Sequence, residues 1–300
     1  MQISPHWSSR TSFRFCITSR SSSCSAMAQE KWLDSTAEWQ AALFHIIRCP
    51  SLKVLQLNYI TNFPIARLSP SCFNVLKLRG IRIALEKRQI RSLPLSSLRI
   101  LDVAPWLGSL GSNLHSLLAS APNLEHLLYH GALYRKSHDF HLPLMIFLLF
   151  PLASHASNIL GIADAILHTP QTISNLRALE VDITWDEDGF TLSGFVDEIR
   201  RLSSHRGVRM ALTNMVISLQ AMNGCKTMVE QGFNTLDKIL FRRSFPHLER
   251  LHLVYTEERV MENEEYGRLE RWLRNAFPRL GKLSNFELEF TISSTESVFW

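Results

Sequence analysis

Four histidines, His126, His130, His138 and His141, form a loose cluster along the chain. Imidazole rings bind metal ions and transfer protons near neutral pH, so such a cluster could form a metal site or an acid–base site. The five cysteines give a metal site no support, because they form no CxxC pair and have no clustered histidine partner. We therefore expect these histidines to lie at the surface or at strand edges, and the sequence predicts no metal site.

Two short segments could suggest other chemistry. Gly108–Ser112 is rich in glycine, but it has neither the lysine and length of a phosphate-binding loop nor the Gly-x-Ser-x-Gly spacing of hydrolases. Asp186–Gly189 is acidic, but it lacks the alternating ligands and the distal glutamate of a calcium-binding EF-hand. We interpret the first segment as the start of a helix and the second as a solvated turn. The sequence predicts a protein that is not an enzyme and has no cofactor.

The charge of the chain argues against nucleic acid as a partner. The net charge is +5, and residues 1–30 supply +2 of it. The remaining residues carry +3 with both signs interspersed, which is too little and too scattered for binding to a phosphate backbone. The cysteines are sparse, as is typical of a reducing compartment, so we expect a cytoplasmic or nuclear protein.

The amino-terminal segment differs in composition from the rest of the chain. Residues 1–27 contain nine serines, three arginines and no acidic residue. This composition is typical of a disordered tail, and a mitochondrial transit peptide is the alternative. Because the arginines line no clear amphipathic face, we predict a disordered Ser/Arg-rich tail over residues 1–30 and a leucine-rich-repeat-like domain over residues 31–300.

A phrase of the form Leu-x-x-Leu-x-Leu, preceded by a proline or serine, recurs through the chain, most clearly at Leu52 and Leu248. The early copies are 21 to 26 residues apart, which matches the period of leucine-rich repeats. A later step of 52 residues equals two of 26, and a step of 72 leaves room for two longer units, with a hidden strand near 208–212. The first apolar positions of the copies are Leu52, Phe73, Leu98, Leu124, Leu176, Leu248 and Leu280.

The phrase predicts a short strand, because alternate leucines point to one face of a strand. Helical patterns lie between the strands, at 35–48, 111–120, 195–202 and 266–277, and a final strand alternates apolar residues over 286–292. Ser35 and Glu38 form a candidate capping box for the first helix. The predicted fold is α/β: an irregular leucine-rich-repeat solenoid with a mainly parallel sheet on one face and helices on the other.

Residues 142–163 contain no Asp, Glu, Lys or Arg. A membrane helix needs about 20 mainly apolar residues, so the segment could be one, and a membrane-associated or mitochondrially targeted repeat protein is the alternative function. Pro143, Pro151 and several polar residues dilute the segment. We therefore favour a buried pair of repeat elements, and do not expect a membrane as partner.

The run Ala42–Leu52, followed by Tyr59–Pro64, resembles the repeat region of mushroom-type fungal F-box proteins, and so does Ser244–Leu253. The resemblance covers roughly residues 35–295. In that family an F-box docks on a ubiquitin-ligase adaptor and the irregular repeats select the target. This chain shows no Leu-Pro-x-Glu-type opening of an F-box before residue 35, so the resemblance is to the repeat region without a recognisable F-box.

The predicted function is that of a non-enzymatic protein-interaction module, with substrate recognition for an F-box-type ubiquitin ligase as its most specific form. Its partner would be a protein, and a ligase adaptor in that specific form. The residues beside the inward leucines should project from the concave face, and their mixed charge suits a protein surface better than a small-molecule pocket. The predicted partner-binding residues are Gln56, Asn58, Asp102, His126, Glu180, Asp182, Arg250 and His252.

Overall fold

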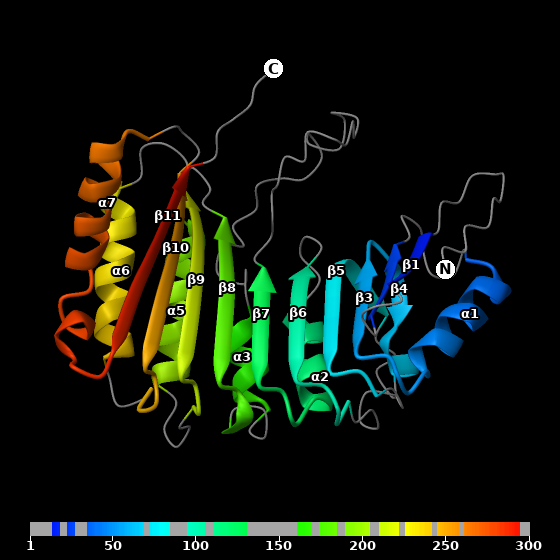
Figure 1. Cartoon of the computed structure of the whole chain (residues 1–300). Coiled ribbons are helices and arrows are strands. Elements are labelled where there is room, and N and C mark those ends of the chain that lie inside the picture. The colour runs from blue at the N-terminus through cyan, green and yellow to red at the C-terminus, as the bar shows by residue number, and fades with distance from the viewer. Residues whose placement is uncertain are drawn as a thin grey trace.

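A computed structural model of the chain describes residues 14–18, 23–27, 35–68, 72–84, 95–105, 111–130, 161–169, 174–184, 190–204, 210–221, 226–241, 245–257 and 261–294. Its strands form one sheet in which, apart from β4, strands that follow one another along the chain are also neighbours in space (Figure 1). The strands are β1 (Arg14–Thr18), β2 (Ser23–Met27), β3 (Val54–Asn58), β4 (Thr61–Pro64), β5 (Val75–Ala84), β6 (Ile100–Pro105), β7 (His126–His130), β8 (Ala178–Thr184), β9 (Asn214–Ala221), β10 (Arg250–Glu257) and β11 (Glu287–Ser294).

The sheet is mostly parallel, as predicted. Its order is β1-β2-β3-β5-β6-β7-β8-β9-β10-β11, with β4 paired to β5 beside this path. The pair β1–β2 is antiparallel and the other pairs are parallel. The sheet does not close on itself, and the α/β class with a mainly parallel sheet is confirmed.

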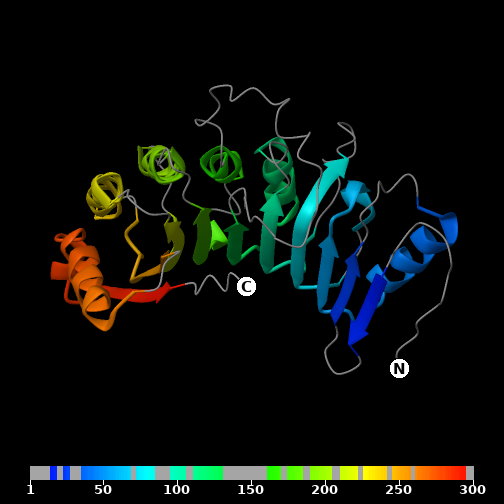
Figure 2. The ribbon, with the colours of Figure 1, turned by 90° about the horizontal axis from the view of Figure 1, so that it is seen from above.

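The helices lie on one side of the sheet. Seen along the strands, the sheet curves, and the helices follow its outer side (Figure 2). The other side, which we call the open face, is left without helices among the described residues. The helices are α1 (Ala37–Ile47), α2 (Gly111–Ser120), α3 (Ile162–Leu167), α5 (Phe190–Ser204), α6 (Lys226–Leu240) and α7 (Asn263–Asn275), with 3-10 helices η2 (Ile65–Leu68) and η6 (Leu280–Lys282).

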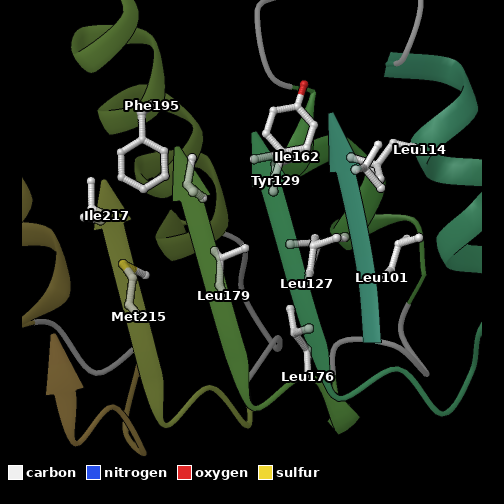
Figure 3. Close-up of a cluster of buried hydrophobic side chains, with 14 of the residues drawn as sticks. Leu101, Leu114, Leu127, Tyr129, Ile162, Leu176, Leu179, Phe195, Met215 and Ile217 are labelled. Atoms are coloured by element: carbon white, nitrogen blue, oxygen red, sulfur yellow. The ribbon is translucent and has the colours of Figure 1, made fainter. Parts of the chain in front are cut away.

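The apolar side chains of the strands face these helices and form a continuous core (Figure 3). In the centre, Leu127 and Leu179 lie on neighbouring strands, and Leu114 and Phe195 approach them from α2 and α5. All four side chains are at most 1% exposed. Full burial of a leucine or phenylalanine stabilises the fold by roughly 1.5–3 kcal/mol relative to leaving it exposed, so this layer holds each strand to its covering helix.

The copies at Leu52, Leu98, Leu124 and Leu248 fold as a tight turn followed by a strand. The N–H of Leu52 donates to the carbonyl of Cys49 at 3.0 Å, and the N–H of Leu124 donates to that of Ala121 at 3.2 Å. The leucine that ends the turn is buried in the first three copies and partly buried at Leu248, and the strand starts two residues later. The proline or serine of the phrase therefore supplies the turn, and its first leucine anchors the turn in the core.

A ladder of backbone hydrogen bonds ties each turn to the next. The N–H groups of Asn74 and Val75 both donate to the carbonyl of Lys53, at 2.9 and 3.1 Å. The next unit repeats this arrangement one strand along, because Arg99 and Ile100 both donate to the carbonyl of Asn74. We call this the turn ladder. Its further acceptors are the carbonyls of Arg99, Glu125, Arg177 and Thr213.

Three details of the predicted repeat are wrong. The strand in the long step is β9 at Asn214–Ala221 and not at 208–212, while Leu212 is the buried turn residue before it. The step of 52 residues from Leu124 to Leu176 does not place a further strand between β7 and β8, because these two strands pair directly. The last copy does not begin at Leu280, which lies in the 3-10 helix η6 rather than before a strand. The strand that ends the sheet, β11, agrees with the predicted alternation over 286–292.

The four predicted helices correspond to α1, α2, α5 and α7, whereas α3 and α6 were not predicted. The cap of α1 is Thr36, whose hydroxyl accepts from the N–H of Trp39 at 3.3 Å, and the predicted capping box from Ser35 and Glu38 is wrong. The register of the prediction fails by one residue because Thr36 is the residue with the extended backbone that directly precedes the first helical turn.

Two predicted segments fall partly outside the described residues. Residues 14–18 and 23–27, placed in a disordered tail on composition, form β1 and β2 at one edge of the sheet, so the structure differs there from the prediction. Of the apolar segment 142–163, the described part is Gly161 and the first two residues of α3. Among the described helices, none has the length and apolar character that crossing a membrane requires.

Candidate functional site

All eight residues predicted to bind a partner lie on strands of the open face. They alternate with core residues along each strand: Gln56 and Asn58 flank Leu57, for example, and Glu180 and Asp182 flank Val181. Asn58 and Asp102 are themselves buried. Because successive side chains of a strand point to opposite faces, this alternation puts the predicted residues on the side away from the helices. Their position agrees with the prediction, and their role in binding stays a prediction.

The centre of the open face is a histidine held between two aspartates on three adjacent strands. Nε2 of His130 on β7 lies 2.9 Å from Oδ1 of Asp102 on β6, and Nδ1 lies 2.8 Å from Oδ2 of Asp182 on β8. Both distances are those of good hydrogen bonds. The two bonds join three strands that follow one another along the chain and are adjacent in the sheet, and they fix the ring in one orientation.

This arrangement favours the charged form of the histidine. The hydrogen bonds to Asp102 and Asp182 raise the pKa of His130 from 6.5 to about 9, against the opposite effect of burial. For Asp102, burial alone would raise the pKa, but the hydrogen bond to His130 and the positive charges of His130, Arg79 and Lys77 lower the pKa below its ordinary value. At neutral pH Asp102 is therefore a carboxylate and His130 is an imidazolium that also contacts Asp182.

Two cations on β5 complete the cluster. Nζ of Lys77 lies 3.9 Å and Nη2 of Arg79 lies 3.5 Å from Oδ2 of Asp102. The register of the sheet brings Lys77 directly opposite Asp102. We call these five residues the central cluster: Lys77, Arg79, Asp102, His130 and Asp182.

The central cluster is poorly arranged for general-base catalysis by His130. Both ring nitrogens of His130 are taken by carboxylates, so the ring has no lone pair with which to accept a proton from a substrate. Among the described residues, no three His, Cys, Asp or Glu side chains are grouped so that they could hold a metal ion. His126 and His130 share the open face of β7, whereas His138 and His141 lie outside the described residues.

The other predicted residues form smaller groups rather than one site. Nε2 of Gln56 donates to Oδ1 of Asn58 at 3.1 Å, and Nε2 of His126 lies 4.0 Å from Oε2 of Glu180. At the other end of the sheet, Arg250 and His252 on β10 each contact a side chain of β11. Arg250 donates from Nε to Oε2 of Glu287 at 2.7 Å, and His252 lies 2.8 Å from the hydroxyl of Thr291.

The sequence-based prediction omitted three members of the central cluster, Lys77, Arg79 and His130. A signal for them was present. In the copy that begins at Phe73, Lys77 and Arg79 occupy the positions that Gln56 and Asn58 occupy in the copy before. His130 follows Leu127 by three residues, so continued alternation along the strand places it on the open face with His126.

Two buried carboxylates on the helix side serve the fold. Oε2 of Glu198 accepts from the N–H of Ala163 at 2.6 Å, in the first turn of α3. Oδ1 of Asp237 accepts from the N–H of Leu280 at 3.0 Å, which holds η6 against α6. Each side chain satisfies backbone donors that would otherwise be unpaired, so neither is a candidate for chemistry.

The chain was compared with protein-family models, with curated proteins and with solved structures, and none of the three comparisons gave a match.

Proposed function

We propose that this chain is a non-enzymatic protein-interaction module, built as an irregular leucine-rich-repeat solenoid, whose open face binds a partner protein. In its most specific form the module selects substrates for a ubiquitin ligase of the F-box type. The observation that carries the proposal is the central cluster, in which five charged side chains from four adjacent strands are fixed on the face that no described helix covers.

Fixed polar groups on a sheet face favour recognition for a physical reason. A side chain that is already held by hydrogen bonds loses little conformational freedom when a partner binds, so less of the binding free energy is spent on ordering it. Charged groups in fixed positions also select partners by complementary charge. The turn ladder adds to this, because it keeps neighbouring strands in register and so keeps the side chains of different units in fixed relative positions.

The solenoid part of the proposal is supported by the way the units repeat. Buried turn residues at Leu52, Leu98, Leu124 and Leu176 each precede a strand by two residues, and consecutive strands are parallel neighbours. Each unit then buries its apolar face mainly against its neighbours, as in other repeat proteins.

Site-specific photo-cross-linking tests where the partner binds. A photoreactive amino acid at Val216 would lie between Glu180 and His252, which flank it in the register of β8, β9 and β10. We expect a discrete adduct with one protein from the source organism's cell extract. The matched control carries the same amino acid at Lys238, which is exposed on α6, and should give no such adduct.

The charge reversals Glu180→Lys and Arg250→Glu, made together, give the second readout. Both side chains are partly exposed on the open face, so we expect the adduct to disappear while the circular dichroism spectrum and the thermal midpoint stay close to those of the wild type. An equal yield of adduct from Lys238, or an adduct unchanged by the two reversals, would show that the open face is not the binding surface.

The ligase form has its own test. The tagged full chain would be purified from its source cells and the co-purifying proteins identified by mass spectrometry. A ligase adaptor and a cullin in stoichiometric amounts would support substrate recognition for a ubiquitin ligase. Recovery of another protein without them would remove ubiquitin transfer and leave the interaction module.

A further inference from the structure

The amino-terminal part of the open face carries an apolar row beside two cations. Val54, Val75 and Ile100 are directly opposite one another on β3, β5 and β6, and all three are partly exposed. Lys77 lies two residues along β5 from Val75, and Arg79 two residues farther. We call these five residues the amino-terminal patch.

The charge that this patch presents to a partner is positive. The side chains of Lys77 and Arg79 are 37% and 49% exposed, whereas that of Asp102, their shared counter-ion, is 4% exposed. The carboxylate thus lies beneath the cations and is already bound by His130 at 2.9 Å. A group that approaches from solvent meets an ammonium and a guanidinium first, and their loose contacts of 3.9 and 3.5 Å to Asp102 leave donors of both free for a second carboxylate.

An exposed aromatic side chain stands at the same end of the strands. Tyr59 follows β3, its N–H donates to the carbonyl of Arg79 at 2.8 Å, and its side chain is 41% exposed. Its φ of 56° lies in the left-handed region, which a tyrosine rarely adopts. Tyrosine and arginine, together with tryptophan, are the residue types that most often dominate protein–protein interfaces. Tyr59 and Arg79 therefore add to the case for a binding patch.

The opposite end of the open face has the reverse charge. Carboxylates are concentrated on β8 and β11. Arg250 on β10 and Glu287 on β11 pair with each other at 2.7 Å, so Glu289 supplies the excess negative charge of β11. The open face is therefore polar along its length, from cations on β5 to anions on β8 and β11. The carboxylates of this end are Glu180, Asp182, Glu287 and Glu289.

We infer that the amino-terminal patch binds a protein segment that combines acidic residues with aliphatic ones, the acids over Lys77 and Arg79 and the aliphatic side chains over the row of Val54, Val75 and Ile100. The inference rests on the proposed function, because it specifies the partner of the same open face. A basic residue farther along the segment would reach the carboxylates of β8.

The spacing of the strands sets the length of this segment. Three strand intervals separate β5 from β8, which is about 14 Å at the usual strand spacing. An extended peptide advances about 3.3 Å per residue, so an acid and a base about four to five residues apart would meet the two charged regions at once. Burial of the apolar row against the aliphatic side chains supplies affinity, and the charges set the direction of the segment.

Selection from a random peptide library tests the inference on the full chain. A phage-displayed library of 12-residue peptides would be selected on the immobilised wild-type protein, and the enriched peptides measured by fluorescence anisotropy. We expect enrichment of Asp and Glu together with Leu, Ile, Val or Met. The double variant Lys77→Glu/Arg79→Glu should weaken binding by at least about tenfold.

Two controls sharpen the result. Lys238→Glu/Arg271→Glu changes the net charge equally but on exposed positions of α6 and α7, and should leave the affinity within about twofold. A peptide whose acids are replaced by lysine should prefer Lys77→Glu/Arg79→Glu over the wild type. That reversed preference would separate a direct charge contact from general damage to the protein.

Several outcomes would overturn the inference. These are a selection without acidic peptides, no selected peptide at all, an affinity unchanged by Lys77→Glu/Arg79→Glu, and displacement of the peptide by a 12-nucleotide RNA that binds more tightly, which would make the cations a nucleic-acid site. If a partner still cross-links at Val216 in any of these cases, the proposed function stands and the inference alone fails.

Discussion

The units from β3 to β7 and the units from β8 to β11 have the same kind of turn and strand but differ in the segment that covers the strand. In the first region, successive turn residues from Leu52 to Leu124 are 21 to 26 residues apart. In the second, Leu176, Leu212 and Leu248 are 36 residues apart each time, and the added length forms the helices α5 and α6, of 15 residues each. The strand and its turn are therefore the constant part of the unit, and the covering segment is the variable part.

The open face differs between the two regions as well. In the first, charged side chains link β5, β6 and β7, and the network reaches Asp182 on β8, the first strand of the second region. In the second, contacts join neighbouring strands in pairs, as between Arg250 and Glu287 or between His252 and Thr291. Short units thus carry the shared charge network, while long units carry the larger helical layer.

The largest effect should come from the helical layer of the second region. Phe233 of α6 is 1% exposed, and its ring lies 5.4 Å from that of Phe277 and 6.5 Å from that of Trp272. Phe233→Ala should lower the free energy of unfolding by about 3–5 kcal/mol, because it leaves a cavity among these rings. Urea denaturation measures this loss.

Hydrogen exchange on Phe233→Ala then tests whether the two regions are separate in stability. If units depend mainly on their neighbours, the amides of β9 to β11 should lose protection more than those of β3 to β6. The control is Phe241→Ala just after α6, where the ring is 47% exposed and little should change. Uniform loss of protection along the chain would mean that both regions unfold as one unit.

The charge network of the first region should make stability depend on pH. Since the pKa of His130 is raised from 6.5 to about 9, its contribution is fully present below pH 6.5 and is lost as the pH rises through 9. His130→Gln should therefore lower the free energy of unfolding most below pH 6.5. This loss should become smaller, by at most about 3 kcal/mol, as the pH rises above 9. Urea denaturation of both proteins below pH 6.5 and above pH 9 measures the change.

A control variant for His130→Gln is available on β9, the strand next to β8. Ser218 is opposite Asp182 in the register of β8 and β9, and Ser218→Ala removes no titrating group. Its difference from the wild type should stay constant over the same pH range. If His130→Gln behaved like Ser218→Ala, the ring of His130 would not be held in its charged form between the two aspartates.

The smallest effect concerns side chains that join successive turns. Nδ2 of Asn123 donates to the carbonyl of Ser96, and Nδ2 of Asn175 to that of Pro122, both at 2.8 Å. Asn123→Ala should cost about 0.5–1.5 kcal/mol, the usual value of one hydrogen bond. In the second region Ala211 occupies the equivalent position, so Ala211→Asn should raise stability by up to about 1 kcal/mol. A lower thermal midpoint for Ala211→Asn would show that the turns of the long units are arranged differently.

The strands were easier to predict from the sequence than the segments between them. Leucine at three positions of a short phrase indicates both the turn and the inward face, so β3 and β10 were found. The strand β9 was misplaced because Met215 and Ile217 stand where other copies have leucine. The helix α6 was missed because its apolar residues Phe233, Leu236 and Leu240 follow a helical period without a phrase that marks the unit.

The faces of the strands were predictable, but the contacts across them were not. Alternation along each strand put Asp102 and Asp182 on the open face. Their joint contact with His130 depends on the direct pairing of β7 with β8, which the step of 52 residues disguised as two units. Predicting contacts between strands requires the strand order of the sheet. Spacing along the chain does not determine that order when unit lengths vary.

The turn ladder has a consequence for how such a surface can change during evolution. Because each link between units is made by main-chain N–H and carbonyl groups, any residue other than proline can donate there, and the side chains of Lys53, Arg99 and Glu125 are not needed for it. Insertions between strands leave the link in place, as units of 21 and 36 residues both show. Selection can therefore replace the side chains of the open face one at a time, while the main-chain links keep the spacing of the strands the same.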